Sequence, residues 1–396
     1  MTNSSITNGS VHPVRDRTTT LDFVRGFVLL GILVSIIDSY GGSLAFGNEV
    51  HSPSSSWDEV LGFWMPLIIN RRFIAIFSLL FGIGIAIQQQ NFASRGVPFT
   101  GYFLRRMAML ALLGVINTTF FFWTEILLVY AVFGTVVYLI SRWPRGLLLT
   151  LAGLAFFVWG SLYEVVGRPR WIELFGWFVQ DYSGDQLRQI YSQGPFWAAA
   201  KLRWIEYGTI YADNGFHLGM SFAMILVGYL AGSNGWHRTF MSELEKYRKL
   251  FGFALLYSVG FGLLAWQQGR PEFLITDSLV LSVLHAVFTL ATIFAYVFLL
   301  AALSRKLGPN HVVSRALANN GRLSLTGYMG GAGVYALIFC HPGLGWYAQL
   351  NKPQQIGLAI AVYLAFTVFS WIWLKRFERG PIEWVFRRLS YGRPLS

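Results

Sequence analysis

The sequence predicts an all-α fold, a polytopic bundle of about ten transmembrane helices. Of its 396 residues, 54% are hydrophobic and only 13% are charged, whereas a soluble domain carries about 25% charged residues. Aromatic residues make up 17% of the chain, which is typical of proteins with broad lipid-facing and interfacial surfaces. The single cysteine, Cys340, excludes an internal disulfide and a cysteine metal cluster.

Ten segments satisfy the length requirement for a membrane span, which is about 20 mostly apolar residues. An even number of crossings puts both termini on the same side of the membrane. The predicted spans are roughly 21–39, 72–90, 104–122, 124–141, 146–166, 215–232, 250–267, 277–303, 322–341 and 355–374.

Basic residues set the orientation of these spans. With the N-terminus in the cytoplasm, the inner segments hold most of the 31 Lys and Arg residues, as the positive-inside rule requires. The sequence therefore predicts an N-in, C-in multi-pass protein whose partners are membrane lipids. The net charge of +12 follows from this topology, so we expect no nucleic-acid partner. The oligomeric state is left open.

Three regions divide the predicted chain. Residues 1–20 are polar and are expected to form a disordered cytoplasmic tail, and no signal-peptide cleavage site follows the next apolar run. Residues 21–374 form a single transmembrane domain, and residues 375–396 form a cytoplasmic C-terminal segment.

Two outer segments are long enough to fold on their own. Residues 57–70 mix Trp with acids and are too short to span, which favours an interfacial or re-entrant helix. The second segment is expected to hold helices that lie on the membrane and cover a cavity between the spans. These helices are predicted at 171–179, 185–191 and 197–207.

Charged residues at the inner ends of spans indicate a site for an anionic ligand. Asp22 and Arg25 lie three residues apart at the start of the first span, so their side chains share one helix face. A charge inside an apolar span is a functional hypothesis by default. The alternative is that Asp22 only interacts favourably with the helix dipole and that the Arg25 side chain extends to the lipid headgroups.

Other inner span ends repeat this pattern. Arg322, preceded by Asn320, enters the ninth span much as Arg25 enters the first, and Arg105 and Arg106 lie at the inner end of the third. Basic residues at an inner mouth suit an anion that arrives from the cytoplasm. The alternative is anchoring under the positive-inside rule.

The outer side carries a second basic pair. Arg71 and Arg72 lie against the charge rule at the head of the second span, where two guanidiniums can hold a phosphate or carboxylate of a substrate. Asp38 ends the first span, where the helix dipole disfavours a carboxylate. We expect Asp38 to pair with Arg71 or Arg72. The alternative partners of the arginines are Asp58, Glu59 and lipid headgroups.

Candidates for acid–base chemistry also lie near the outer span ends. Glu125 is predicted to start the fourth span, and Asn117 lies eight residues earlier, inside the third. His217 is a candidate general base, with His285 and His341 as further buried or interfacial histidines. The spacing of the histidines gives no metal-ligand pattern.

Four sequence blocks, in order between about residues 17 and 394, resemble the YeiB-like bacterial inner-membrane proteins, which carry domain of unknown function 418. The blocks are Leu21-Asp22-x-x-Arg25-Gly26-Phe27, Phe77-Ser78-Leu79-Leu80-Phe81-Gly82-Ile83-Gly84, Asn320-Gly321-Arg322-x-Ser324-Leu325-Thr326-x-Tyr328, and Arg379-Gly380-Pro381-Ile382-Glu383-Trp384 with Tyr391-Gly392-Arg393. This resemblance implies a location in the bacterial inner membrane.

The opening block is also similar to a wider set of transmembrane acyltransferases. That similarity implies transfer of an acyl group from cytoplasmic acyl-CoA, a co-substrate with no permanently bound cofactor beside it, to an envelope glycan or lipid. The residues expected to hold the acyl-CoA are Asp22, Arg25, Arg105, Arg106, Asn320 and Arg322. Those expected to bind the acceptor are Arg71, Arg72, Asn117 and Tyr328. The candidate catalytic residues are Glu125, His217 and Asp38.

The chain departs from these relatives at the outer ends of the early spans. Residues 35–38 contain no histidine, and Asn117 and Glu125 occupy the places of a His and an Asp. Asn cannot accept a proton, so an acyltransferase mechanism must rest on Glu125, Asp38 or a histidine elsewhere. A transporter or flippase of a small anionic or lipid-linked solute, and a non-catalytic structural or regulatory protein, are the alternative functions.

Overall fold

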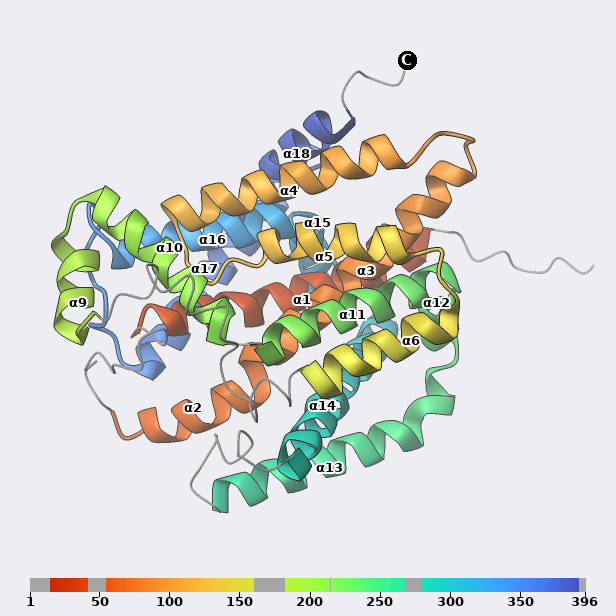
Figure 1. The fold of residues 1–396 in the computed structure, drawn as a ribbon, viewed down its shortest axis with the longest axis horizontal. Helices are drawn as coiled ribbons and strands as arrows, with labels where there is room; N and C mark the ends of the chain where they lie inside the picture. The colour runs from red at the N-terminus through yellow and green to blue at the C-terminus, as the bar shows by residue number, and fades with distance from the viewer. Residues whose placement is uncertain (1–14, 42–54, 160–181, 214, 268–278, 392–396) are drawn as a thin grey trace, which may run out of the picture.

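The computed structural model describes residues 15–41, 55–159, 182–213, 215–267 and 279–391, and the secondary structure of these residues is entirely helical (Figure 1). The elements in chain order are α1 (Arg15–Ser39), α2 (Asp58–Met65), a π-helical turn (Pro66–Asn70), α3 (Arg71–Ala93), α4 (Thr100–Phe120), α5 (Leu127–Ile140), α6 (Arg145–Gly153), a second π-helical turn (Leu154–Trp159), α9 (Gly184–Gln193), α10 (Phe196–Asp213), α11 (Gly215–Ser233), α12 (Trp236–Ser242), a 3-10 turn (Leu244–Tyr247), α13 (Arg248–Gln267), α14 (Leu279–Leu307), α15 (Val312–Arg322), α16 (Ser324–Phe339), α17 (Lys352–Trp373) and α18 (Pro381–Tyr391).

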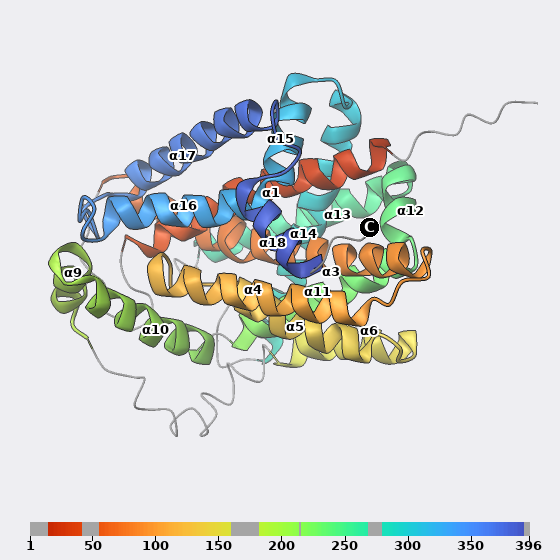
Figure 2. The same ribbon diagram turned by 90° about the horizontal axis from the view of Figure 1, so that it is seen from above.

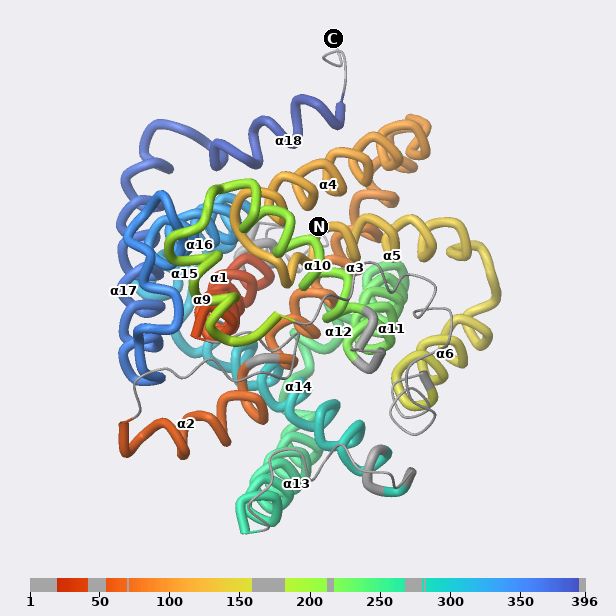
Figure 3. The backbone as a smooth tube through the Cα atoms, turned by 60° about the vertical axis from the view of Figure 1, so that its left-hand side comes forward, coloured from red at the N-terminus to blue at the C-terminus, as the bar shows by residue number. Residues whose placement is uncertain are grey.

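Helix α1 is the central element of the bundle (Figure 3). It packs against α3, α14, α15, α16 and α17. Phe23, Val28, Leu33 and Ile37, spread along its length, are all fully buried. A helix that is apolar on every side belongs in the core of a helical protein, and the first predicted span therefore organises the packing of the others.

The apolar helices confirm a membrane protein at the coarse level. In the described part of the chain, six helices are long and apolar enough to cross a membrane, and the pair His217–Ser233 and Trp236–Ser242 is bent by 78°. Shorter apolar helices cover Leu127–Ile140 and Arg145–Val158. Each of the ten predicted spans contains a helix, while the number of crossings and their orientation stay predictions.

The predicted outer helices are found where the structure describes them. Helix α2 begins at Asp58 and continues through a π-helical turn into α3, and α9 and α10 match the helices predicted at 185–191 and 197–207. The helix predicted at 171–179 lies outside the described residues.

Helical structure continues beyond both ends of the predicted transmembrane domain. Helix α1 begins at Arg15, so residues 15–20, expected to belong to a disordered tail, are helical. The C-terminal segment contains α18, which lies across α4 and the start of α16 (Figures 1 and 2). Residues 381–391 are therefore part of the folded bundle and pack beside the N-terminal part of α4.

Two glycines bring α1 and α15 into backbone contact. A Cβ atom added at Gly321 would lie 1.8 Å from the Asp22 carbonyl oxygen, and one added at Gly26 would lie 1.9 Å from the Leu317 carbonyl oxygen. No side chain fits at such distances, so glycine is required at both positions. The contact sets α15, and with it the start of α16, against the charged beginning of α1.

We expect Gly321→Ala to destabilise the protein by about 1–3 kcal/mol, because the added methyl forces α15 away from α1. Thermal unfolding of the purified protein in detergent measures the effect. Gly330→Ala is the matched control, since a Cβ there meets nothing within 4 Å. An equal melting temperature for Gly321→Ala and wild type would contradict the proposed packing.

Candidate functional site

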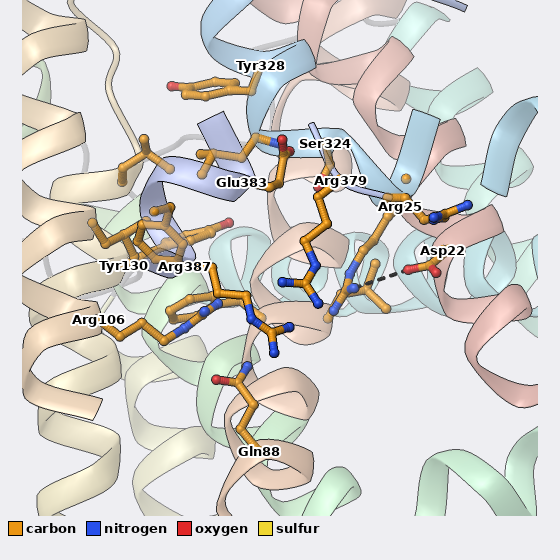
Figure 4. Close-up of a pocket in the computed structure, with 18 of the residues that line it drawn as sticks. Asp22, Arg25, Gln88, Arg106, Tyr130, Ser324, Tyr328, Arg379, Glu383 and Arg387 are labelled. Carbon is orange, nitrogen blue, oxygen red and sulfur yellow. Dashed lines mark hydrogen bonds and ion pairs between the residues drawn. The ribbon is translucent and has the colours of Figure 1, made fainter. Parts of the chain in front are cut away.

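A cavity of about 860 Å³ lies at one end of the bundle, within the usual range for small-molecule sites (Figure 4). Its walls come from the beginnings of α1, α4, α5 and α16, from α3, from the end of α15 and from α18. The beginnings of α1, α4 and α16 and the end of α3 are helix ends that the charge distribution predicts to be cytoplasmic. The predicted topology therefore makes this cavity open to the cytoplasmic side.

Arginine dominates the lining of the pocket. Six arginines line it beside three carboxylic acids, Asp22, Glu378 and Glu383. The arginines are Arg25, Arg95, Arg106, Arg322, Arg379 and Arg387. Figure 4 shows the guanidinium groups of Arg25, Arg379 and Arg387 directed into the same space. This excess of positive charge favours an anionic ligand.

Two of the arginines are engaged by the protein. Arg25 Nη1 lies 3.3 Å from Asp22 Oδ1, and Arg322 Nη2 donates a hydrogen bond to the Glu378 carbonyl oxygen at 2.8 Å. Asp22 therefore orients Arg25 along its own helix face, as the three-residue spacing predicts.

Other arginines face the cavity without a carboxylate partner. In the described part of the chain, no carboxylate lies within 4.0 Å of Arg379 or Arg387. Arg387 lies over the Tyr391 ring at 4.8 Å, and Arg106 lies over the Phe386 ring at 4.7 Å. Arg106 also has a side-chain hydrogen bond with Tyr102. The stacked guanidinium of Arg387 faces the cavity (Figure 4), where it can bind a phosphate or carboxylate.

The deep end of the pocket is formed by a polar pair. Tyr328, which lines the cavity, donates a hydrogen bond from its hydroxyl to Glu125 Oε2 at 3.1 Å. Glu125 is fully buried and also accepts hydrogen bonds from Asn117 Nδ2 and the Leu127 amide. The structure thus connects a buried carboxylate to the cavity through the Tyr328 hydroxyl.

Apolar side chains also line the pocket, namely Phe77, Leu80, Phe81 and Leu110. The lining therefore combines cationic groups, apolar walls and a tyrosine–carboxylate pair. This combination suits a ligand with an anionic head and an uncharged arm.

The C-terminal segment supplies one wall of the pocket, which the sequence reasoning missed. Glu383 accepts hydrogen bonds from the Leu325 and Thr326 amides at 2.8 and 2.9 Å. Burial raises the pKa of the Glu383 carboxyl above its ordinary value, and the hydrogen bonds from Thr326 oppose this rise. The block from Arg379 to Trp384 was the available signal, but nothing in it indicates which helix it contacts.

Four of the six residues predicted to hold acyl-CoA line the pocket, namely Asp22, Arg25, Arg106 and Arg322. Arg105 points elsewhere, because its Nε donates to the Ser390 carbonyl oxygen at 3.0 Å. Asn320 is fully buried and is bonded to α17 through Thr367 and Ser370, each at 2.7 Å. The predicted ligand contacts of Arg105 and Asn320 are thus replaced by contacts that join helices.

The predicted outer sites are corrected as well. Asp38 pairs with Lys352 at the start of α17. Arg72 is buried, where it donates to the Pro66 carbonyl oxygen at 2.8 Å and to Thr289 Oγ1 at 3.4 Å. Of the two predicted partners of Asp38, Arg72 is therefore wrong, because Arg72 turns toward α14, and the pairing with Arg71 stays a prediction.

The remaining candidates divide between the pocket and its surroundings. Asn117 and Glu125, predicted at separate span ends, are in contact. Glu125 lies just before α5, which begins at Leu127, and accepts a hydrogen bond from the Leu127 amide, so it lies at the start of this helix as predicted. Arg71 and His217 are not among the residues that line the pocket.

A buried central helix, apolar helices around it and a basic pocket at one end define a helical membrane protein. A family model described as "Protein of unknown function (DUF418)" matches residues 231–393. The chain is 27% identical to the uncharacterized protein YxaH of Bacillus subtilis (strain 168) over 95% of this chain and 94% of the relative. It is 28% identical to the uncharacterized protein YeiB of Escherichia coli (strain K12) over 95% and 96%. These similarities confirm the resemblance to the YeiB-like DUF418 proteins that the sequence blocks predict.

We expect pyrophosphate to stabilise the wild-type protein against heat by about 2.7 kcal/mol when its concentration is about 100 times Kd. The double variant Arg379→Ala/Arg387→Ala should lose most of this stabilisation, since both guanidiniums face the cavity. Differential scanning fluorimetry in detergent at constant ionic strength measures it. Arg238→Ala, an exposed arginine outside the pocket, should behave as wild type. Equal stabilisation of the double variant would contradict the anion site.

Proposed function

We propose that this protein is an inner-membrane acyltransferase that takes acyl groups from cytoplasmic acyl-CoA and passes them to a hydroxyl of an envelope glycan or lipid. One observation carries the proposal: a single cavity joins an arginine-lined mouth to the Tyr328–Glu125 pair. The similarity of the opening Leu-Asp-x-x-Arg-Gly block to transmembrane acyltransferases supports the same reading.

The mouth has the chemistry that coenzyme A requires. The phosphates of coenzyme A carry several negative charges, and the guanidinium groups of Arg25, Arg379 and Arg387 face the space that would receive them. Arg106 adds a fourth cation stacked on Phe386. Arginine binds phosphate with two parallel N–H bonds. The uncharged arm of the ligand would then run along the apolar side chains of the pocket and carry its thioester toward Tyr328.

The reaction at the deep end needs a proton acceptor beside the acceptor hydroxyl. The hydroxyl oxygen attacks the thioester carbonyl carbon, a C–O bond forms and the C–S bond breaks. The hydroxyl proton moves onto the Tyr328 oxygen as Tyr328 gives its own proton to Glu125. The reverse transfer delivers that proton to the leaving sulfur, so the products are an ester and free coenzyme A.

Among the three predicted catalytic residues, Glu125 fits this role. It is bonded to Tyr328 of the pocket lining, and Asn117 donates to the same carboxylate oxygen, Oε2. Asp38 is paired with Lys352 and, like His217, does not line the cavity. Asn117 is thus a positioning residue, which accounts for an amide where relatives carry a histidine.

We expect Glu125→Gln to lower turnover of labelled acetyl-CoA by about 10²–10⁴-fold while leaving CoA affinity within about twofold, because the change is isosteric and the arginines are untouched. Purified protein, [¹⁴C]acetyl-CoA and envelope glycans or lipids provide the assay. Glu245→Gln, at an exposed site away from the pocket, is the control. Wild-type turnover by Glu125→Gln would refute the assignment, and absence of CoA binding by wild type would refute the proposed function.

A transporter of anionic or lipid-linked solutes is the second candidate. The π-helical turn Pro66–Asn70 between α2 and α3 and the bend of 78° after Ser233 favour it, since interrupted helices are typical of transporters. Flux of a labelled solute into proteoliposomes without covalent change would support transport and exclude transfer.

A further inference from the structure

Glu383 closes the exposed end of a helix to which it does not belong. Helix α16 begins at Ser324, and its N-cap residue Leu323 makes no side-chain capping bond. The first amides of a helix need partners from outside it, and a carboxylate is favoured there by the helix dipole. Glu383 supplies them, because its Oε1 accepts from the Leu325 and Thr326 amides at 2.8 and 2.9 Å.

Its second oxygen completes the junction between α18 and α16. Glu383 Oε2 accepts a hydrogen bond from Thr326 Oγ1, which in turn accepts one from the Ile382 amide at 3.2 Å. A Cβ added at Gly380 would lie 2.0 Å from Glu383 Oε2 and 2.6 Å from Thr326 Oγ1. Glycine at position 380 therefore leaves the space in which the carboxylate folds back onto α16.

The two elements that meet here carry opposite ends of the pocket. Tyr328 follows the capped turn by two residues and bonds Glu125 at the deep end. Arg379 precedes Gly380, and Arg387 lies four residues beyond Glu383 on the same face of α18. Figure 4 shows Glu383 between Tyr328 and Arg379. The remainder of α18 is held on α4 by Arg105 and Arg106.

We propose that Glu383 is a positioning residue that couples the two ends of the pocket. It sets the axial position of α16, and so the approach of Tyr328 to Glu125, and it sets the placement of Arg379 and Arg387 at the mouth. The expected effect on turnover rests on the proposed function. The capping of α16 by Glu383 rests on the contacts alone.

Hydrogen–deuterium exchange of the full-length protein tests the cap without a ligand. We expect the peptide covering residues 321–330 to exchange about tenfold faster in Glu383→Ala than in wild type, since two amides lose their acceptor. Glu383→Gln keeps one amide oxygen as acceptor and should restore slow exchange. If Glu383→Ala does not fold, Thr326→Val is the milder variant for the same exchange measurement. It removes the hydroxyl that donates to Glu383 Oε2 and keeps both amides bonded.

Steady-state kinetics with acetyl-CoA tests the coupling. We expect Glu383→Ala to raise KM about tenfold and to lower kcat about tenfold, because both ends of the pocket shift. Tyr328→Phe should lower kcat alone. Adding Glu383→Ala to Tyr328→Phe should lower kcat no further, since the two changes disturb one element. Glu245→Ala is the matched control. If Glu383 only stabilised the fold, Glu383→Ala would lower the apparent kcat by reducing the fraction of active protein, and KM would be unchanged.

Each result decides the proposal. Unchanged exchange in residues 321–330 for Glu383→Ala, or an unchanged KM with additive losses in kcat, overturns it. If wild type neither binds CoA nor transfers acetyl groups, the proposed function fails. The exchange experiment then still tests the cap, and loss of pyrophosphate stabilisation in Glu383→Ala tests its link to Arg379 and Arg387.

Discussion

The backbone contact between α1 and α15 is the constraint on which the pocket depends. Gly26 and Gly321 let the two helices approach until carbonyl oxygens occupy the space of a Cβ atom. This approach places Arg322 beside the charged beginning of α1 and fixes where α16 starts. The apolar burial of α1 stabilises the whole bundle, but the glycine contact decides where its charged end meets the rest of the protein.

Polar side chains then join elements that are distant in sequence. Asn320 bonds α17, Tyr363 donates to the Gly26 carbonyl oxygen at 2.7 Å, and Glu383 caps α16. In an apolar environment a buried polar group must be paired. Each of these bonds therefore fixes one helix against another, and together they hold a cavity open among closely packed helices.

The proposed chemistry follows from the combination of surfaces in that cavity. Arg379 and Arg387, which have no carboxylate partner among the described residues, suit an anion, apolar walls suit an uncharged arm, and the Tyr328–Glu125 pair offers a proton acceptor. Asp22 and Arg25 form a smaller part of the pocket than their position in the sequence indicates. Their ion pair at 3.3 Å orients one arginine of a set, and Arg379 and Arg387 from the far end of the chain complete it.

The sequence by itself determined the helical membrane class, helices at each predicted span and the family, because apolar run length and motif order are local properties. It also indicated four charged residues of the pocket, since charges at inner span ends are costly unless they are used, and Tyr328. Only the tertiary structure decided which residues these side chains contact. Asp38 pairs with Lys352, Arg105 and Asn320 bond neighbouring helices, and Glu383 caps α16. Those choices depend on which helices become neighbours, which no single segment encodes.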